Sequence, residues 1–220
     1  MKTSLPLLFV LLGALTLPLA AEDAKPLLNK PGKVIAEPSL KEPVAAPWSV
    51  GKGKWTAADG VITAGDVPEE KHIPVLHLAT GPTNLIWECE FRFNAGKAFL
   101  IGCDGQKHVG RVVIAAKSLK IAEDTVAPSK TVTETPVDLK SDEWHKVRVE
   151  YAGDQLAARV DGQEIRAQHP YFSTPKVRWW FAAADGVQIR NVRITEGQPI
   201  SPAPAPTNAA APAAAPAPAK

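Results

Sequence analysis

The sequence lacks several features that define large classes of protein. Its 25 Lys and Arg residues nearly balance its 23 Asp and Glu residues, and no basic cluster stands out. Because such clusters supply most of the affinity for phosphate backbones, the composition argues against a nucleic-acid partner. The sequence also has no nucleophile elbow, phosphate-binding glycine loop or nucleotide fingerprint, and nothing in it indicates a cofactor.

A long hydrophobic run is absent after the first 21 residues. The chain opens with Lys2, continues through an apolar stretch of about 15 residues, and reaches Ala20 and Ala21 before two acidic residues. This order is typical of a secretory signal peptide, and the stretch is shorter than the roughly 20 residues that span a bilayer. We therefore expect residues 1–21 to be a cleaved signal peptide. The mature protein is expected to be secreted or periplasmic, without a membrane span.

Proline density is lowest in the middle of the chain and higher toward both ends. After residue 197 the sequence is almost purely Pro and Ala, so that segment cannot bury enough apolar surface to repay ordering. We expect a Pro- and Lys-rich N-terminal arm at 22–47, one domain at 48–197 and a disordered tail at 198–220.

Helical spacing is almost absent between residues 48 and 197. Segments such as KVRVEY, GRVVIAA and KVRWWFAA alternate apolar and polar residues, as strands with one solvated face do. Asp-Gly pairs and similar turn signals separate these segments. About ten to twelve short strands in one domain predict an all-β fold, an antiparallel two-sheet β-sandwich of the jelly-roll type.

The last predicted strand contains a change of phase. Val187 and Ile189 occupy the buried side at odd positions, whereas Val192 and Ile194 occupy it at even positions. One extra residue is needed to make this change, so we predict a β-bulge at residues 190–191. This prediction concerns the fold and implies no chemistry.

The stretch WECEFRFNAGKAFLIGC, residues 87–103, is interpreted as a hairpin around an Asn-Ala-Gly-Lys turn. With the turn centred on Gly96, Cys89 faces Cys103 at the end of a buried apolar ladder. Export permits a disulfide, but directly opposed strand positions strain that bond. A disulfide and a buried pair of free thiols both remain open. A catalytic thiol is not expected, because reactive cysteines need an exposed, electropositive site.

The same alternation sends Glu88, Glu90 and Arg92 to the opposite face. Retaining glycosidases hold two carboxyl groups about 5 Å apart, and residues i and i+2 of a strand lie roughly 6.5–7 Å apart. The pair is therefore a weak candidate for catalysis. The glucanase pattern on sandwich folds has a third acidic residue, however, and a neighbouring arginine favours ionised carboxylates over a general acid. A solvated, ion-paired ligand-binding face is the alternative.

Aromatic and basic residues supply the other candidates for ligand binding. Arg178 and Trp180 share one face of KVRWWFAA, and an indole beside a cation suits a sugar ring. The alternative is that a loop or the arm covers Trp180. A polar rim is also expected from four further residues, namely His72, His108, Arg111 and His169. None of these histidines has the spacing of metal ligands, so no metal site is predicted.

The order of these segments resembles a known family. KWTAADGVI, ECEFRFNAGKAFLIGCDG, EWHKVRVEYAGDQLAARVDGQ and GVQIRNVRITEG are similar to segments of the 3-keto-disaccharide hydrolase domain family. The resemblance covers most of residues 48–197. It implies the concanavalin A-like lectin and glucanase fold, in an exported protein whose concave face or loop rim handles sugars.

These observations predict an exported domain that binds a carbohydrate or glycan without cleaving it, with an envelope or matrix component as a further partner. One alternative is a glycoside hydrolase acting on 3-keto-sugars, with Glu88, Glu90 or the histidines as acid and base. A second alternative is a structural envelope module without a small ligand. If their strands share a sheet, the Glu88 group and the Arg178 group should line one groove.

Overall fold

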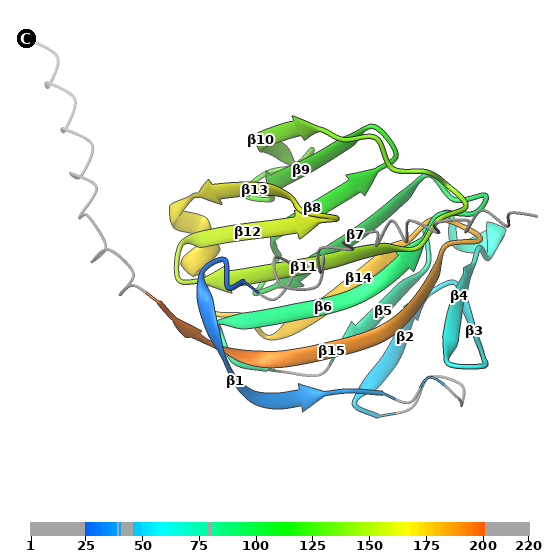
Figure 1. Cartoon of the computed structure of the whole chain (residues 1–220), viewed down its shortest axis with the longest axis horizontal. Helices are drawn as coiled ribbons and strands as arrows, with labels where there is room; N and C mark the ends of the chain where they lie inside the picture. Colours follow the sequence, from blue (N-terminus) through cyan, green and yellow to red (C-terminus); the bar gives the residue numbers. More distant parts are fainter. Residues whose placement is uncertain (1–24, 39, 41–45, 79–80, 201–220) are drawn as a thin grey trace, which may run out of the picture.

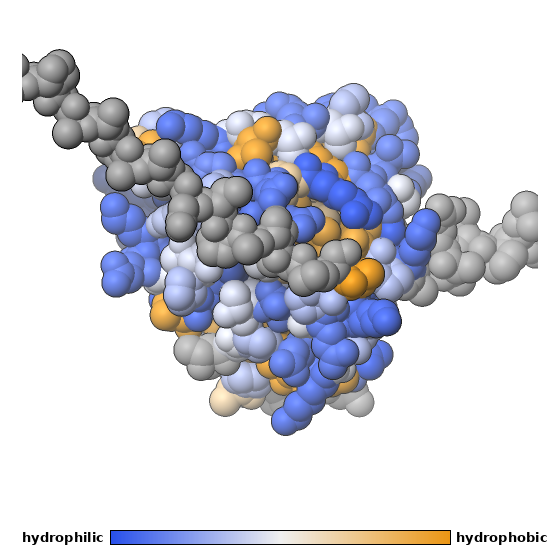
Figure 2. Space-filling view, turned by 90° about the vertical axis from the view of Figure 1, so that its left-hand side faces the viewer, coloured by the Kyte–Doolittle hydropathy of each residue, from blue (hydrophilic) through white to orange (hydrophobic). Residues whose placement is uncertain are grey.

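The computed structural model describes residues 25–38, 40, 46–78 and 81–200. Within these ranges the chain forms two antiparallel sheets packed face to face, which confirms the predicted sandwich (Figure 1). Figure 2 views the sandwich from the left-hand side of Figure 1. On this end hydrophilic residues predominate, and hydrophobic residues show as small separate areas. The predicted signal peptide and most of the predicted tail lie outside the described residues.

The first sheet, sheet A, has eight strands. They are β1 (Asn29–Ala36), β3 (Lys54–Ala58), β4 (Val61–Gly65), β6 (Leu85–Arg92), β11 (His145–Ala152), β12 (Gln155–Val160), β13 (Gln163–Gln168) and β15 (Gln188–Pro199). The strand order is β13-β12-β11-β6-β15-β4-β3, and β1 also pairs with β15.

The second sheet, sheet B, has seven strands. They are β2 (Trp48–Lys52), β5 (Val75–Leu78), β7 (Ala98–Asp104), β8 (His108–Ala115), β9 (Ser118–Glu123), β10 (Lys130–Pro136) and β14 (Arg178–Ala183). The strand order is β10-β9-β8-β7-β14-β5-β2. Two short 3₁₀ helices, η1 (Pro68–Glu70) and η2 (Pro170–Ser173), lie in connections. In the part of the chain that the structure describes, no helix has the length and apolar character needed to cross a membrane.

The core is filled by the inner faces of both sheets, as the alternation predicts. Trp87 and Phe91 of β6, Trp179 and Phe181 of β14, and Tyr151 of β11 are all buried in one cluster. Edge-to-face contacts join the aromatic rings, including Trp87 with Phe181 at 5.5 Å between centroids. The large side chains of the two sheets therefore interdigitate and fix how the sheets face each other.

The predicted bulge in the last strand is confirmed. The register between β15 and β6 shifts between Arg190 and Arg193. Asn191 has a φ of 53°, in the left-handed region that asparagine tolerates better than most residues. The bulge lets Ile189 and Val192 both reach the core.

The predicted hairpin at residues 87–103 is wrong. β6 pairs with β11 and β15 in sheet A, whereas β7 pairs with β8 and β14 in sheet B. The chain therefore crosses between sheets at residues 93–97. Alternation fixes which side chains are buried, but it leaves open which strand is the partner. Cys89 and Cys103 lie on the inner faces of different sheets, and both are buried free thiols.

Residues 29–36 belong to the sandwich, although the sequence placed them in the arm. They form β1, which pairs with β15 from Asn29 opposite Pro199 to Ala36 opposite Ile194 (Figure 1). Most side chains between the ends of β1 are exposed or half-buried, so the strand carries no clear period-two signal. The predicted start of the domain at residue 48 is therefore too late.

Candidate functional site

The ligand-binding candidates lie on opposite outer faces of the sandwich. Glu88, Glu90 and Arg92 alternate with core residues on β6 in sheet A. Arg178 and Trp180 alternate with core residues on β14 in sheet B. The two groups cannot line one groove, because both sheets and the core separate them.

A buried carboxylate organises the outer face of sheet B. Asp104, at the end of β7, is only 5% exposed. Its Oδ2 accepts two hydrogen bonds from Arg178, at 2.9 and 2.5 Å. Its Oδ1 accepts from Trp180 Nε1 at 2.7 Å and pairs with His108 Nδ1 at 2.6 Å. We call Asp104, His108, Arg178 and Trp180 the Asp104 cluster.

The contacts of the Asp104 cluster shift the pKa values of its titratable groups and of His77 beside it. Burial raises the pKa of Asp104, but the hydrogen bonds from His108, Arg178 and Trp180 outweigh it and hold this pKa at about 2. The bond to Asp104 raises the pKa of His108. On β5, burial and then the charge of Arg178 lower the pKa of His77, which lies opposite Trp180. Near neutral pH the carboxylate is ionised, and His108 holds a proton more readily than His77 does.

Trp180 lies beside Arg178 as predicted, and of the two alternatives for its ring, open or covered, the structure shows the covered one. The side chain is 3% exposed. Its six-membered ring lies over Gly102 of β7, where a Cβ atom would come within 2.4 Å of the ring. Arg111 lies over the indole at 5.8 Å, and His108 meets it edge-on at 5.6 Å. A glycine in a strand lets a ring lie flat on the neighbouring backbone, and the spacing of the sequence does not reveal which ring does so.

The carboxylates of Asp104 and Asp124 on this face are fully used, whereas two donors beside them are not. Arg111 binds both oxygens of Asp124, and the Ser129 hydroxyl adds a third bond to that carboxylate. No other described residue is a hydrogen-bond partner of Arg178 Nη1 or of His108 Nε2. The side chains of Arg178 and His108 are 46% and 56% exposed. Around Asp104, the face therefore presents donors without free carboxylate acceptors.

A small apolar patch adjoins the Asp104 cluster. Val75, Trp180 and Ala182 are buried together, and Ile73 and Leu100 pack against them half-buried. Val75 and Ala182 are paired neighbours on β5 and β14, and Ala182 is two residues along β14 from Trp180. On the outer face of sheet B, Ile73 and Leu100 therefore supply the small apolar surface that lies near the fixed donors.

On sheet A, each carboxylate of the weak catalytic pair is bound to an arginine. Glu88 accepts from Arg148 at 2.6 Å, and Glu90 accepts from Arg190 at 2.7 Å. These contacts form the ion-paired face that was the alternative to catalysis. Neither glutamate has the apolar surroundings that a general acid with a raised pKa requires.

Arg92 serves the same ion-paired face. Its guanidinium donates twice to Gln188 Oε1, at 3.2 and 2.6 Å. Arg92 and Arg190 also lie over the ring of Trp144, at 4.9 and 4.0 Å from the ring centroid. These cation–π contacts cover the indole face, so Trp144 offers little stacking surface to a ligand.

A hollow of about 170 Å³ opens on the outer face of sheet A, over β6, β11, β12 and β15. The lining residues are Glu88, Cys89, Glu90, Lys146, Val147, Arg148, Arg159, Asp161 and Asn191. The hollow is smaller than the roughly 300–1,000 Å³ of drug-sized pockets, so it suits one small polar unit. Asn191 was treated in the sequence as a fold device only. Its position at a bulge, which re-aims a side chain, was the signal that could have found it.

The predicted rim of histidines does not form. His72 lies between η1 and the start of β5, and this start is the end of the strand that is farther from Asp104. The Nδ1 atom of His72 lies 2.7 Å from the carbonyl oxygen of Ile73. His169 caps η2 by accepting from Tyr171 N. Only His108 joins the Asp104 cluster. Within the described ranges, no group of three or more potential metal ligands is gathered in one place.

No protein-family model matches the sequence, and no curated protein matches it. Solved structures do match the fold. The CBM2 module of the evolved Dit of Lactobacillus casei BL23 phage J-1 has a TM-score of 0.60 at 9% identity, covering 78% of this chain and 98% of that one. A prokaryotic β-1,3-1,4-glucanase (lichenase) from a mouse hindgut metagenome has a TM-score of 0.54 at 11% identity, covering 74% and 98%.

A third match is the exoplasmic/lumenal domain of VIP36 in its Ca²⁺/Man3GlcNAc-bound form, with a TM-score of 0.53 at 8% identity, covering 74% and 87%. At such identities these likenesses show the β-sandwich fold alone. They confirm the predicted fold, and they do not confirm the resemblance to the 3-keto-disaccharide hydrolase family.

Proposed function

We propose that this protein is an exported carbohydrate-binding domain whose ligand lies on the outer face of sheet B. The observation that carries the proposal is the Asp104 cluster, which holds exposed donors of Arg178 and His108 at fixed positions beside an apolar patch. A sugar ring has hydroxyl edges and apolar C–H faces, so a surface with both properties suits it. The matched fold of a carbohydrate-binding module, a glucanase and a sugar-bound domain supports the ligand class.

The preferred ligand is an acidic sugar. Asp104 and Asp124 have no unused oxygen, while Arg178 Nη1 and His108 Nε2 remain available. A uronic acid carboxylate can accept from both groups, and charge-assisted bonds of this kind are roughly twice as strong as neutral ones. Because the anion favours protonated His108, affinity should fall as the pH rises through the raised pKa of His108.

Cleavage of 3-keto-sugars is the second candidate, and one observation favours it. The Asp104–His108 pair lies on the same face as His77, whose pKa is lowered, so this face carries one histidine that holds a proton more readily and one that holds it less readily, as acid–base catalysis requires. Binding is preferred because the carboxylates of Glu88 and Glu90 lie on the opposite face and are ion-paired. Asp104, with a pKa of about 2, is unsuited to donate a proton.

The test is a titration of the mature protein with trigalacturonate, an acidic trisaccharide, and with a neutral trisaccharide of similar size. The wild type should bind the acidic sugar, and Arg178→Ala should weaken that binding at least tenfold. The matched control is Arg193→Ala, because Arg193 is an exposed arginine on sheet A. Equal losses of affinity in both variants would show that the acidic sugar binds through the overall positive charge of the protein and not at a defined site. Turnover of a 3-keto-glycoside by the wild type, abolished in His108→Gln, would establish the hydrolase instead.

A further inference from the structure

The hollow on sheet A has a chemistry opposite to that of the Asp104 cluster. Glu88 uses one carboxylate oxygen to bind Arg148, and Glu90 uses one to bind Arg190. The second oxygen of each glutamate, and the side-chain amide of Asn191, have no partner among the described residues. Free carboxylate oxygens accept hydrogen bonds and repel anions, and an amide both donates and accepts. The hollow therefore suits a neutral group that is rich in hydroxyls.

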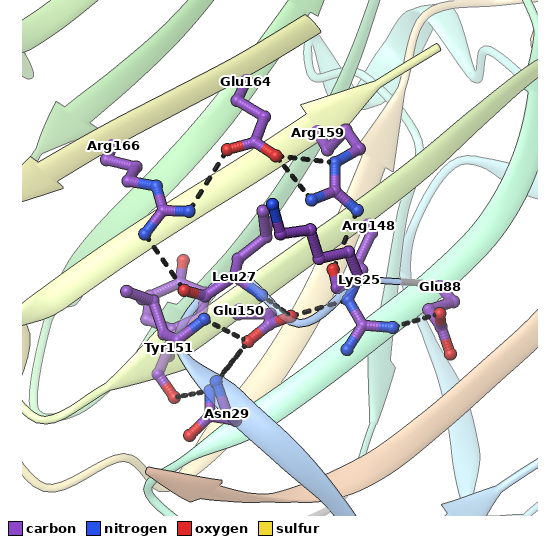
Figure 3. Close-up of polar contacts among 11 residues, drawn as sticks. Lys25, Leu27, Asn29, Glu88, Arg148, Glu150, Tyr151, Arg159, Glu164 and Arg166 are labelled. Atoms are coloured by element: carbon purple, nitrogen blue, oxygen red, sulfur yellow. Dashed lines mark hydrogen bonds and ion pairs between the residues drawn. The ribbon is translucent and has the colours of Figure 1, made fainter. Parts of the chain in front are cut away.

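The walls of the hollow are held rigidly by a segment that crosses the outer face of sheet A. Residues 25–29, which we call the N-terminal strap, reach Glu150, a carboxylate with 0% exposure (Figure 3). Glu150 accepts from the backbone N–H groups of Leu27, Leu28 and Asn29 at 2.9, 2.8 and 2.6 Å. It also accepts from Arg148 Nε at 2.6 Å. The strap thus fixes Glu150, which in turn fixes Arg148.

A second wall of the hollow is fixed in the same way. Arg159 donates from Nη1 to the carbonyl of Lys25 at 2.9 Å, and from two other nitrogens to Glu164 (Figure 3). Beside it, Asp161 pairs with His145 and accepts from the backbone N–H of Lys146. Side chains that are already ordered lose little conformational entropy when a ligand binds, so this hollow is pre-organised.

One donor in the hollow's lining is also unmatched. Arg148 is nine-tenths buried, and its Nη2 has no hydrogen-bond partner among the described residues, while its other two nitrogens bind Glu88 and Glu150 (Figure 3). Leaving a buried donor without a partner is unfavourable, and native proteins do so rarely. Because Nη2 is itself enclosed, a ligand in the hollow does not contact this donor.

We propose that the hollow is a second binding site, for one neutral sugar unit. Sugar hydroxyls donate to the unused oxygens of Glu88 and Glu90, and accept from the Asn191 amide. The volume of about 170 Å³ limits the site to a single unit. This site is independent of the Asp104 cluster, so the domain binds glycans on both outer faces, an acidic unit on one and a neutral unit on the other.

The experiment is a set of chemical-shift titrations of ¹⁵N-labelled mature protein with the methyl glycosides of glucose, galactose and mannose at millimolar concentrations. We expect at least one of them to shift amides of β6, β11 and β15 saturably. Asn191→Gly removes the amide and keeps the positive φ that the bulge requires. This variant should weaken the binding at least tenfold while the unfolding transition is unchanged, and Arg178→Ala should leave it unaltered.

Several results would overturn the proposal. They are no saturable shifts with any of the three glycosides, shifts confined to β7 and β14, or equal binding by Asn191→Gly and the wild type. The two proposals fail separately, because trigalacturonate binding depends on Arg178 and neutral-glycoside binding depends on Asn191. Glu90→Gln supplies a second check, since it keeps the shape of the side chain and should also weaken only the neutral sugar.

Discussion

The two outer faces of the sandwich contain similar residue types and use them in different ways. On sheet B, one buried aspartate collects hydrogen bonds from three side chains, and the exposed donors left over are those of Arg178 and His108. On sheet A, arginines each occupy one oxygen of a glutamate, and the exposed carboxylate atoms left over are acceptors of Glu88 and Glu90. What a face can bind therefore depends on which atoms remain unpaired, and the residue composition alone does not reveal it.

The faces also differ in how deeply their charges are buried. Sheet A carries Glu150 beneath the N-terminal strap, sealed by backbone N–H groups and by Leu27 and Leu28 packed on Ala152 and Ala157. On sheet B, the partners of Asp104 reach solvent through the side chains of Arg178 and His108. We expect sheet A to depend on its buried charge for stability, and sheet B to depend on its charge mainly for binding.

The largest effect should come from Glu150→Ala on sheet A. The change leaves Arg148 partly unpaired and removes the acceptor of three backbone N–H groups, so stability should fall by about 3–5 kcal/mol, as for other broken buried ion pairs. Urea unfolding measures the loss. Glu134→Ala, which breaks an exposed pair with Lys120 on sheet B, is the control and should change stability by about 1 kcal/mol or less. Similar losses of stability in the two variants would contradict the view that the buried charge of sheet A matters more for stability than an exposed ion pair of sheet B.

Gly102→Ala tests how sheet B holds its tryptophan. A Cβ atom there would lie 2.4 Å from the Trp180 ring, so the indole must move, at about 1–3 kcal/mol for overpacking. Trigalacturonate binding should weaken as well, because the moved ring disturbs Asp104 and His108. Gly81→Ala is the matched control, since its Cβ meets Trp179 at an ordinary 3.5 Å. Urea unfolding of both variants measures the difference, and equal stability of the two would show that the contact between Gly102 and the Trp180 ring is loose.

Acid should act on sheet B through Asp104. Its pKa falls from 3.8 to about 2 on folding, so it contributes about 2 kcal/mol that is fully present above pH 3.8 and is lost as the pH falls through 2. Asp104→Asn removes this dependence, so its stability should change less than that of the wild type across this interval. Unfolding curves recorded at several pH values measure the difference. Parallel curves for the two proteins would show that other carboxylates account for the acid sensitivity.

The smallest effect concerns the two cysteines, one from each sheet. Burial raises the pKa of Cys103 to about 12, and it also raises the pKa of the Cys89 thiol well above its usual range. Neither thiol should react with a disulfide reagent in the folded protein, and two thiols should react after unfolding in denaturant. A count of zero in denaturant would establish a disulfide, contrary to the free thiols of the structure.

The sequence predicted the buried positions well because they depend on local alternation. Trp87, Phe91 and Phe181 were all placed correctly in the core, and so was the bulge before Val192. A strand with one dry face and one wet face repeats every two residues, whatever its partner is. That is why the sandwich could be predicted although the hairpin at 87–103 was wrong.

The site could be predicted only in part, because its geometry depends on contacts between distant segments. Asp104 was missed as the centre of its cluster, since its partners Arg178 and Trp180 lie more than 70 residues along the chain. The strap was missed because it binds Glu150 through backbone N–H groups, which leave no side-chain pattern in the sequence. The sequence singled out Arg178, His108 and Arg111, and the structure brings them to one face.

The pairing of β1 with β15 has a consequence for chain connectivity. Asn29 and Pro199 are direct neighbours in the same sheet, so the described domain begins and ends at one place (Figure 1). A peptide from Ile200 back to Lys25 would close the chain and keep the N-terminal strap, and the chain could be opened instead at the turn of Asp59 and Gly60, where a Cβ atom on the glycine would have no atom within 4 Å. Circular permutants opened at exposed turns often keep their fold. The order in which the strands are synthesised is therefore separable from the way they pack.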